Sequence, residues 1–397
     1  MEDKFQVTIP KDIAEKLNLN LKQPVTATLT DDGLTIKPTS KESEPHSILL
    51  FLIPSILATI LFFIRFSVVK MYHVYLTGNN SIENMMFLLG TSIPMIVFTV
   101  LFIQQKRYRK NDTVSKISWR NFPTLLIGFA SMLFLINLGV FQLLGALFTG
   151  ASFDLFTASI LFFIFNAISN YLMITIVENI TPRMIITLLI SVIIGGMTLA
   201  MLSNQKLGWW HRNFSFLGTV DAKYSWVFNL TLILSGLLMI ALVDYLFVAI
   251  HEAHHKNIRF DILRVLLTLT AISFCAIGFL PNNGKGTLHQ LHVQSAHFLV
   301  LFIIALIISI RWLIPDIRQD FIQASYLIGT GLVASVILFQ FVGYFSLTTF
   351  ELLSASLSIG WLLLLLQYLI KFTIGKEVKF EISIRVEEEK RFDIKKI

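Results

Sequence analysis

Residues Tyr224–Ile250, YSWVFNLTLILSGLLMIALVDYLFVAI, carry one charged side chain, Asp244, in a long run of mostly apolar residues. About 20 residues of α-helix cross the ~30 Å hydrocarbon core of a bilayer, so this run predicts a membrane span. Similar runs recur along the chain, at roughly 48–69, 84–104, 121–148, 152–177, 183–202, 225–250, 262–280, 293–313, 321–343 and 350–371. The sequence therefore predicts a mostly α fold, a polytopic membrane bundle of about ten transmembrane helices.

The composition supports the same class. The 397 residues are 55% hydrophobic and 14% charged, with a mean hydropathy of +0.71, whereas an ordinary soluble domain carries about 25% charged residues. The single cysteine, Cys275, lies inside a span. A disulfide framework and a cysteine-based metal site are therefore excluded.

Basic residues are unevenly distributed between alternate loops. They concentrate in the loop 104–120, in the loop after the sixth span, after the eighth span, and in the tail, which adds eight from Lys371 to Lys396. The opposite loops hold only Lys70, Lys206, Arg212, Lys223 and Lys285. Because basic loops stay inside, we expect both termini in the cytoplasm and the protein in the plasma membrane, with the lipid bilayer as its partner.

The first 40 residues are polar and predict a small β-rich unit. FQVTIP is a strand pattern, KDIAEKLNL a short amphipathic helix, and PVTATLT and GLTIKP alternate on either side of an Asp-Asp-Gly hairpin signal. We expect this unit over 1–40, a linker over 41–47, four spans over 48–180, six spans over 181–373 and a cytoplasmic tail over 374–397. The tail alternates apolar and polar residues, which fits a hairpin or a basic segment lying on anionic lipid.

The N-terminal pattern resembles the swapped-hairpin domain of the SpoVT/AbrB and antitoxin family. The matching residues are Val7, Thr8, Ile9, Pro10, Ile13, Leu17, Leu19, Val25, Gly33 and Ile36. The resemblance implies a domain core of Val7, Ile9, Pro10, Ile13, Leu17 and Gly33, and a homodimer in which two chains interleave their strands into a barrel that binds DNA. Residues 1–45 contain six Lys, no Arg and eight Asp plus Glu, which disfavours phosphate binding. Dimerisation alone and binding of DNA or a partner both remain open.

The loop that precedes the opening stretch, with the first turn of its span, resembles the outer loop of a six-helix membrane family, domain of unknown function 998. The matching residues are His211, Ser215, Leu217, Gly218, Phe228 and Asn229, and the resemblance covers roughly 181–373. The family has no established activity, so it implies the six-helix architecture and no chemistry. Trp209, Trp210, Tyr224 and Trp226 are typical of an interfacial aromatic belt.

The outward loops contain a candidate metal site. Its candidate residues are His211, Ser215, Asp221, His289, His292 and His297. Imidazole and carboxylate ligands suit zinc, and a zinc-bound water at this face would support a hydrolase acting on a lipid or a peptidoglycan precursor. The alternative is structural, because His289 near a helix start and Ser215 in a turn can satisfy backbone groups.

An inward candidate is the HExxH pattern His251-Glu252-Ala253-His254-His255, with Asp244 seven residues earlier on the same helical face. Histidines at i and i+4 can hold zinc while the glutamate acts as a base. The second aspartate motif of membrane zinc proteases is missing, and a His-rich segment at the headgroups needs no metal. Asp244 is costly at its depth, so we expect it to face the bundle interior or bond a neighbouring span.

A polar seam in the first four spans is the third candidate. Asn137 lies in the middle of the third span, and Asn166 and Asn170 are four residues apart in the fourth. Such groups usually bond between helices, although a transport path would use them too. The leading functional hypothesis is a membrane-tethered regulator with a DNA-binding or dimerising N-terminal domain. The alternatives are an outward metal-dependent membrane hydrolase and a transporter.

Overall fold

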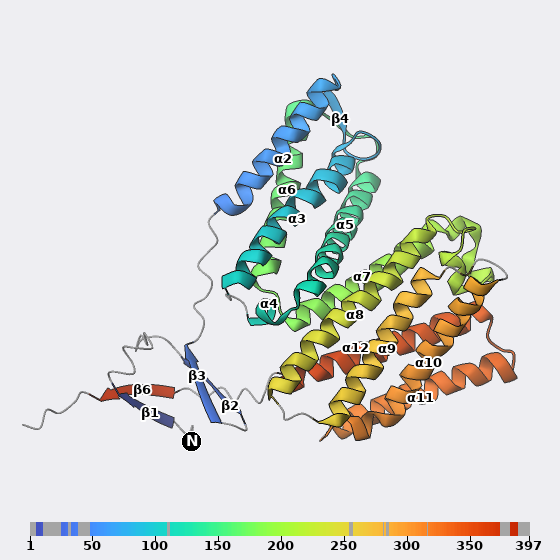
Figure 1. Ribbon diagram of the computed structural model, residues 1–397. Helices are drawn as coiled ribbons and strands as arrows, with labels where there is room; N and C mark the ends of the chain where they lie inside the picture. Colours follow the sequence, from blue (N-terminus) through green and yellow to red (C-terminus); the bar gives the residue numbers. More distant parts are fainter. Residues whose placement is uncertain are drawn as a thin grey trace, which may run out of the picture. The chain divides into compact units, whose positions relative to one another are not determined.

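The structure is a computed structural model that describes residues 5–10, 25–30, 33–38, 48–108, 112–253, 257–280, 282, 286–315, 317–373 and 382–387. Within these residues ten helices are long and apolar enough to cross a membrane, which confirms a mostly α, multi-pass membrane fold (Figure 1). The spans are α2 (Leu49–Val68), α3 (Ile82–Tyr108), α5 (Phe122–Leu147), α6 (Leu155–Glu178), α7 (Pro182–Ser203), α8 (Ser225–Ala253), α9 (Ile258–Phe279), α10 (Thr287–Leu313), α11 (Gln319–Val336) and α12 (Leu347–Thr373).

The chain divides into two compact units. One unit combines residues 1–47 with residues 371–397, and the other comprises residues 48–370. The two ends of the chain therefore belong to one unit, although more than 300 residues separate them along the sequence.

The unit made from the chain ends contains four described strands. β2 (Val25–Thr30) and β3 (Gly33–Pro38) pair antiparallel, where the sequence predicts a hairpin. β1 (Phe5–Pro10) pairs in parallel with β6 (Ile382–Glu387) of the tail, in the register Val7↔Ile384. The helix expected near residues 11–19, with Ile13 and Leu17, lies outside the described residues, as do the side chains of the expected domain core.

The first four spans pack around α6, which contacts α2 and α3. Asp154 caps α6 by accepting hydrogen bonds from the hydroxyl and backbone N–H of Thr157 and from the backbone N–H of Phe156. The Thr157 hydroxyl is the main cause of a lowered pKa at Asp154. Aromatic rings fill the bundle, and Phe62 stacks on Phe162 with centroids 4.5 Å apart. A ribbon of β4 (His73–Tyr75) and β5 (Ser152–Asp154) closes one end.

The helix α8, formed from the opening stretch, is the central helix of the second half. In its span 72% of the most apolar window is buried within the protein, against 44% or less in the other spans. This explains why the stretch is apolar on all sides. Glycines allow close approach: a Cβ on Gly236 would lie 2.5 Å from the carbonyl oxygen of Ala271 on α9. A Cβ on Gly128 of α5 would lie 3.0 Å from the side chain of Leu188 on α7 and 3.2 Å from that of Leu238 on α8.

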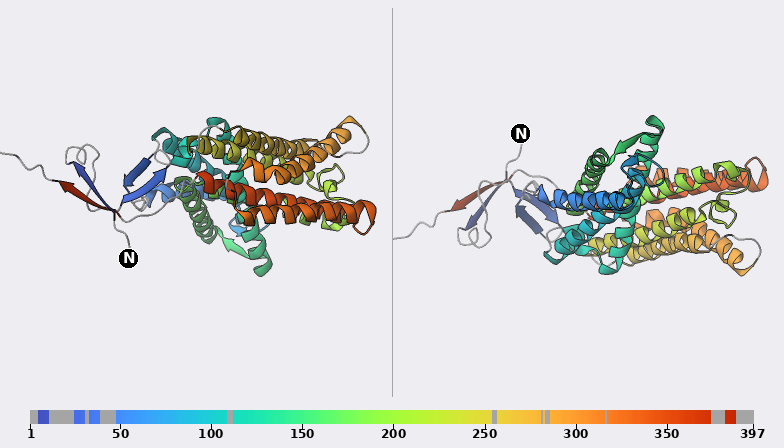
Figure 2. Two further views of the ribbon diagram at one scale, coloured as in Figure 1. Left: turned by 90° about the horizontal axis from the view of Figure 1, so that it is seen from below. Right: turned by 90° about the horizontal axis from the view of Figure 1, so that it is seen from above.

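α10 packs along α9, and α11 packs against α10; Figure 2 shows the spans from below and from above. Trp361 of α12 donates its indole N–H to the Ser325 hydroxyl of α11 (3.0 Å), and both residues are buried. α11 continues into one turn of π-helix, Ile337–Phe341. α10 begins at Thr287, earlier than the expected residue 293, so His289 and His292 lie in its first two turns.

Candidate functional site

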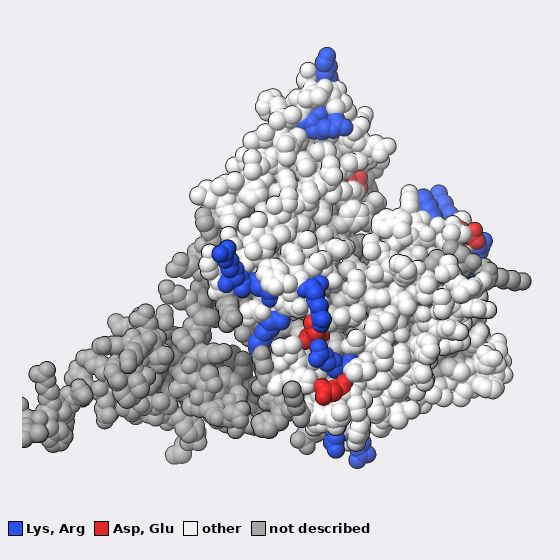
Figure 3. Space-filling view, in the orientation of Figure 1, with Lys and Arg blue, Asp and Glu red and all other residues white. Residues whose placement is uncertain are grey.

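Successive spans are antiparallel, so their connections alternate between two ends of the bundle. One end carries the connections 204–224 and 280–286 and is called the His211 end here. The other carries 109–121 and 254–257 and is called the Arg120 end. On the face drawn in Figure 3, basic side chains gather in a few places, and broad surfaces between them carry no charge.

Two buried or half-buried side chains hold the connection 204–224 against the helices. Asn204, fully buried, donates to the carbonyl of Lys223 (2.9 Å) and accepts from its N–H (2.6 Å). Glu351 of α12 accepts a hydrogen bond from the backbone N–H of Phe214 (2.5 Å). Neither residue was among those predicted from the sequence. Glu351 could have been identified from the sequence, because a carboxylate inside an apolar span requires a partner.

The motif residues of this connection pack against the first turns of α8. Asn229 donates to the carbonyl of Gly218 (3.0 Å), and Leu217 is fully buried. A Cβ at Gly218 would meet Asn229 and would lie 2.9 Å from the ring of Phe228. The Leu-Gly and Phe-Asn pairs therefore contact each other, and their spacing is explained by this packing.

The histidines at the start of α10 bond to the preceding segment. Nδ1 of His289 hydrogen-bonds Oδ1 of Asn282, and Nδ1 of the buried His292 bonds the carbonyl of Leu280 (2.6 Å). Both rings thus hold the connection between α9 and α10, which is the structural alternative considered for His289.

The remaining outward candidates are spread over the His211 end. His211, Asp221 and His297 are exposed and Ser215 is half-buried, while the ring of His211 lies beside that of Trp210, with centroids 5.6 Å apart. The described residues contain no group of three His, Cys, Asp or Glu side chains placed to hold a metal ion. The structure therefore does not assemble the six candidates into one zinc-binding group.

An open depression of ≈ 390 Å³ lies at this end instead. Its lining residues are Arg212, Asn213, Phe216, Thr219, Val220, Asp221 and Asn282; we call it the Arg212 depression. The guanidinium of Arg212 lies 4.4 Å from the centre of the Phe216 ring. Asp221 is the only sequence candidate that lines it, and Asn282 connects it to His289. Arginine, carboxylate and amide groups together suit recognition of a polar molecule.

Asp244 is the centre of a charged cluster at the Arg120 end. Its side chain, 13% exposed, accepts from Nη2 of Arg120 (2.8 Å), Nη2 of Arg264 (3.0 Å) and Nδ2 of Asn121 (3.0 Å). These contacts fit the expected bond to a neighbouring span. Because Arg120 and Asn121 precede α5 and Arg264 belongs to α9, the cluster joins the first four spans to the last six.

The HExxH segment lies beside this cluster. His251 pairs with Asp261 of α9, with Nε2 and Oδ1 3.2 Å apart. The side chain of Glu252 and all of His255 lie outside the described residues. Asp244, seven residues earlier on the same helix, is held by the two arginines.

Three asparagines form the polar part of the four-span bundle. Asn170 donates from Nδ2 to Oδ1 of Asn166 (2.6 Å) and to the hydroxyl of Ser55 on α2 (3.1 Å), and all three residues are fully buried. Nδ2 of Asn137, Nδ2 of Asn166 and Oδ1 of Asn170 are buried with no hydrogen-bond partner. The Asn170–Ser55 bond joins two spans, as predicted for such groups.

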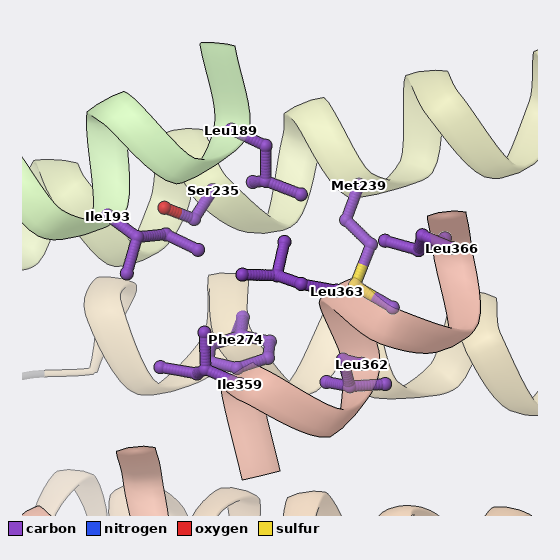
Figure 4. Close-up of a pocket in the computed structure, with 9 residues that line it drawn as sticks. All are labelled: Leu189, Ile193, Ser235, Met239, Phe274, Ile359, Leu362, Leu363 and Leu366. Carbon is purple, nitrogen blue, oxygen red and sulfur yellow. The ribbon is translucent and has the colours of Figure 1, made fainter. Parts of the chain in front are cut away.

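A second cavity lies among α7, α8, α9 and α12 and is small and apolar (Figure 4). Its volume is ≈ 20 Å³, and its lining residues are Leu189, Ile193, Ser235, Met239, Phe274, Ile359, Leu362, Leu363 and Leu366. The Ser235 hydroxyl is already bonded to the carbonyl of Thr231 (2.6 Å). This cavity offers no group that could orient a polar substrate.

Comparisons with known proteins agree with both resemblances. Residues 185–368 match the family model described as protein of unknown function (DUF998), and residues 3–44 match that of antidote-toxin recognition MazE, bacterial antitoxin. No curated protein and no solved structure matches the chain. The chain is a multi-pass membrane protein that joins a segment similar to the MazE antitoxin to a membrane segment similar to a family of unknown function.

Proposed function

We propose that this protein is a membrane-tethered regulator whose antitoxin-like unit dimerises and binds a macromolecular partner. The observation that carries the proposal is the pairing of β1 with β6. It makes both chain ends part of one unit, so that unit is attached to the membrane helices twice, through α2 and through α12. A rearrangement of the helices would act on it through two connections.

The tail also changes the charge of the unit. Residues 1–45 carry six Lys against eight Asp plus Glu, whereas residues 371–397 carry eight Lys plus Arg against six Asp plus Glu. The tail strand supplies Arg385, opposite Thr8, where residues 1–45 contain no arginine. The combined unit is close to neutral, which favours a protein partner over a DNA backbone.

The small size of the sheets supports a homodimer. β1 with β6 and β2 with β3 form two separate two-stranded sheets, and isolated pairs of strands are marginally stable in water. Strands from a second copy would extend them, as in the swapped-hairpin family. Because basic loops tend to stay inside, the basic residues of the loop 104–120 support a cytoplasmic location for this unit.

Dimerisation is tested with the full chain in detergent. We expect a dimer by light scattering, and Ile9→Asp in β1 should convert it to a monomer while the helical signal is retained. Lys4→Gln, which removes a charge next to the same strand in the sequence, is the matched control and should leave the dimer intact. A monomeric wild type, or a dimer that survives Ile9→Asp, would refute the dimer.

The partner class is tested with the same full-length dimer. It is titrated with duplex DNA at increasing salt, because binding through phosphates weakens steeply as salt rises. We expect no salt-sensitive DNA binding. Tight, strongly salt-dependent binding would identify the partner as DNA and overturn the preference for a protein.

The topology is tested separately by labelling intact cells that express the Cys275→Ser variant with an impermeant maleimide. An added Asp221→Cys should be labelled, and an added Lys110→Cys should not.

A further inference from the structure

We propose that the Arg212 depression binds a zwitterionic phosphodiester, a phosphate and an ammonium joined by a short linker as in a phosphoethanolamine headgroup. This assignment goes beyond the regulatory role and does not depend on it. It rests on the charges, the amides and the position of the depression.

Two opposite charges line the same depression without neutralising each other. Among the described residues neither Arg212 nor Asp221 makes an ion pair. The ring of Phe216, 4.4 Å away, orients the guanidinium. A guanidinium presents a fork of donors that matches phosphate, and a carboxylate accepts hydrogen bonds from an ammonium. One ligand carrying both groups would satisfy both side chains.

Two amides also line the depression, those of Asn213 and Asn282. Oδ1 of Asn213 is buried and has no hydrogen-bond partner among the described residues. Oδ1 of Asn282 is occupied by His289, so its amide has Nδ2 left as a donor, which suits a phosphate oxygen. The depression thus offers an amide donor beyond its two charges.

The surroundings of the depression indicate the membrane–water interface. Its connection joins the spans α7 and α8, and Trp210 and Tyr224 in that connection are exposed. Exposed aromatic residues next to spans are typical of the headgroup level. The volume of ≈ 390 Å³ lies in the range of small-molecule sites, about 300–1,000 Å³. Glu351 and Asn204 hold the connection in place, so the site is preformed.

The test uses three soluble probes on the purified full chain. Glycerophosphoethanolamine carries both charges, glycerophosphoglycerol lacks the ammonium, and ethanolamine lacks the phosphate. Binding is measured by saturation-transfer NMR and titration. We expect glycerophosphoethanolamine to bind about tenfold more tightly than either other probe, since one charge-assisted contact is lost in each.

Variants assign each half of the ligand to a residue. Asp221→Asn should abolish the preference for glycerophosphoethanolamine over glycerophosphoglycerol, and Arg212→Gln should weaken both phosphodiesters about tenfold. Lys206→Gln, an exposed charge in the same connection that does not line the depression, should change nothing. Asp221 is exposed and makes no ion pair with another described residue, so its variant is expected to fold. Equal affinity for the three probes, or an unchanged preference in Asp221→Asn, would overturn the proposal.

The source of the headgroup is separated by repeating the titration in nanodiscs. If the ligand is a lipid, nanodiscs of phosphatidylethanolamine should block the soluble probe and nanodiscs of phosphatidylglycerol should not. If it is a free solute, the probe should bind equally in both. Either result supports the site, while loss of probe binding in both kinds of nanodisc would contradict it.

Discussion

Replacing Asp244 with asparagine tests whether the charged cluster joins the two groups of spans. The substitution keeps the size and one hydrogen-bond acceptor but removes the charge that faces Arg120 and Arg264. Two arginines would then point at a neutral amide. We expect the protein to lose stability and the contact between α5 and α8 to loosen.

The size of the expected loss of stability depends on how exposed the paired side chains are. Removing one partner of a buried ion pair costs about 3–5 kcal/mol, whereas an exposed pair contributes about 0–1 kcal/mol. Asp244 is 13% exposed, but Arg264 is 38% and Arg120 68% exposed. Solvent therefore screens part of the interaction, and we expect Asp244→Asn to cost about 2 kcal/mol and Arg120→Gln about 0.5 kcal/mol.

The assay is unfolding of the full chain in mixed detergent with increasing dodecyl sulfate, followed by circular dichroism. The pair Arg318–Asp320 provides the matched control: its N–O distance is 2.7 Å, but its side chains are 69% and 76% exposed. Asp320→Asn should change stability by less than about 0.5 kcal/mol. The double variant Asp244→Asn with Arg120→Gln should cost less than the sum of the single changes. Equal effects of Asp244→Asn and Asp320→Asn would refute the reasoning.

Three further outcomes are expected. Gly236→Ala should lower the free energy of unfolding by about 1–3 kcal/mol, because the added methyl group pushes α8 from α9. Gly360→Ala, with open space at its Cβ, should raise it by up to about 1 kcal/mol. Similar unfolding midpoints for the two variants would contradict this packing. The pKa of Asp154 is lowered by hydrogen bonds from Thr157, so its cap stabilises α6 at neutral pH and is lost as pH falls below about 4. Hydrogen exchange should therefore show fraying at the start of α6 in acid. If the Asp154→Asn variant shows the same dependence on pH, the cap is not the cause. Chelator should leave the thermal midpoint of the wild type unchanged and His289→Ala should lower it equally with or without chelator; a chelator-sensitive wild type would restore the metal site.

The HExxH pattern and the outward histidines illustrate a limit of sequence patterns. Spacing on one helix indicates which side chains share a face, and it placed Asp244 and His251 together. It does not identify what the neighbouring helix presents to each, and here Arg264 meets Asp244 while Asp261 meets His251. The partners lie 20 and 10 residues further along the chain, on the next span. Periodicity within one segment carries no information about them.

Hydropathy alone determined the ten spans, because crossing a bilayer requires about 20 apolar residues in succession and that requirement is local. Turn chemistry alone determined the β2–β3 hairpin, because the two residues between its strands set the pairing. Only the tertiary structure decided that β1 pairs with the tail, that Glu351 holds the connection 204–224, and that Arg212 and Asp221 line one depression. The first two contacts join segments that lie far apart in the sequence, and the depression adds Asn282 to Arg212 and Asp221. A local pattern cannot predict such contacts, because they form only when distant parts of the chain pack together.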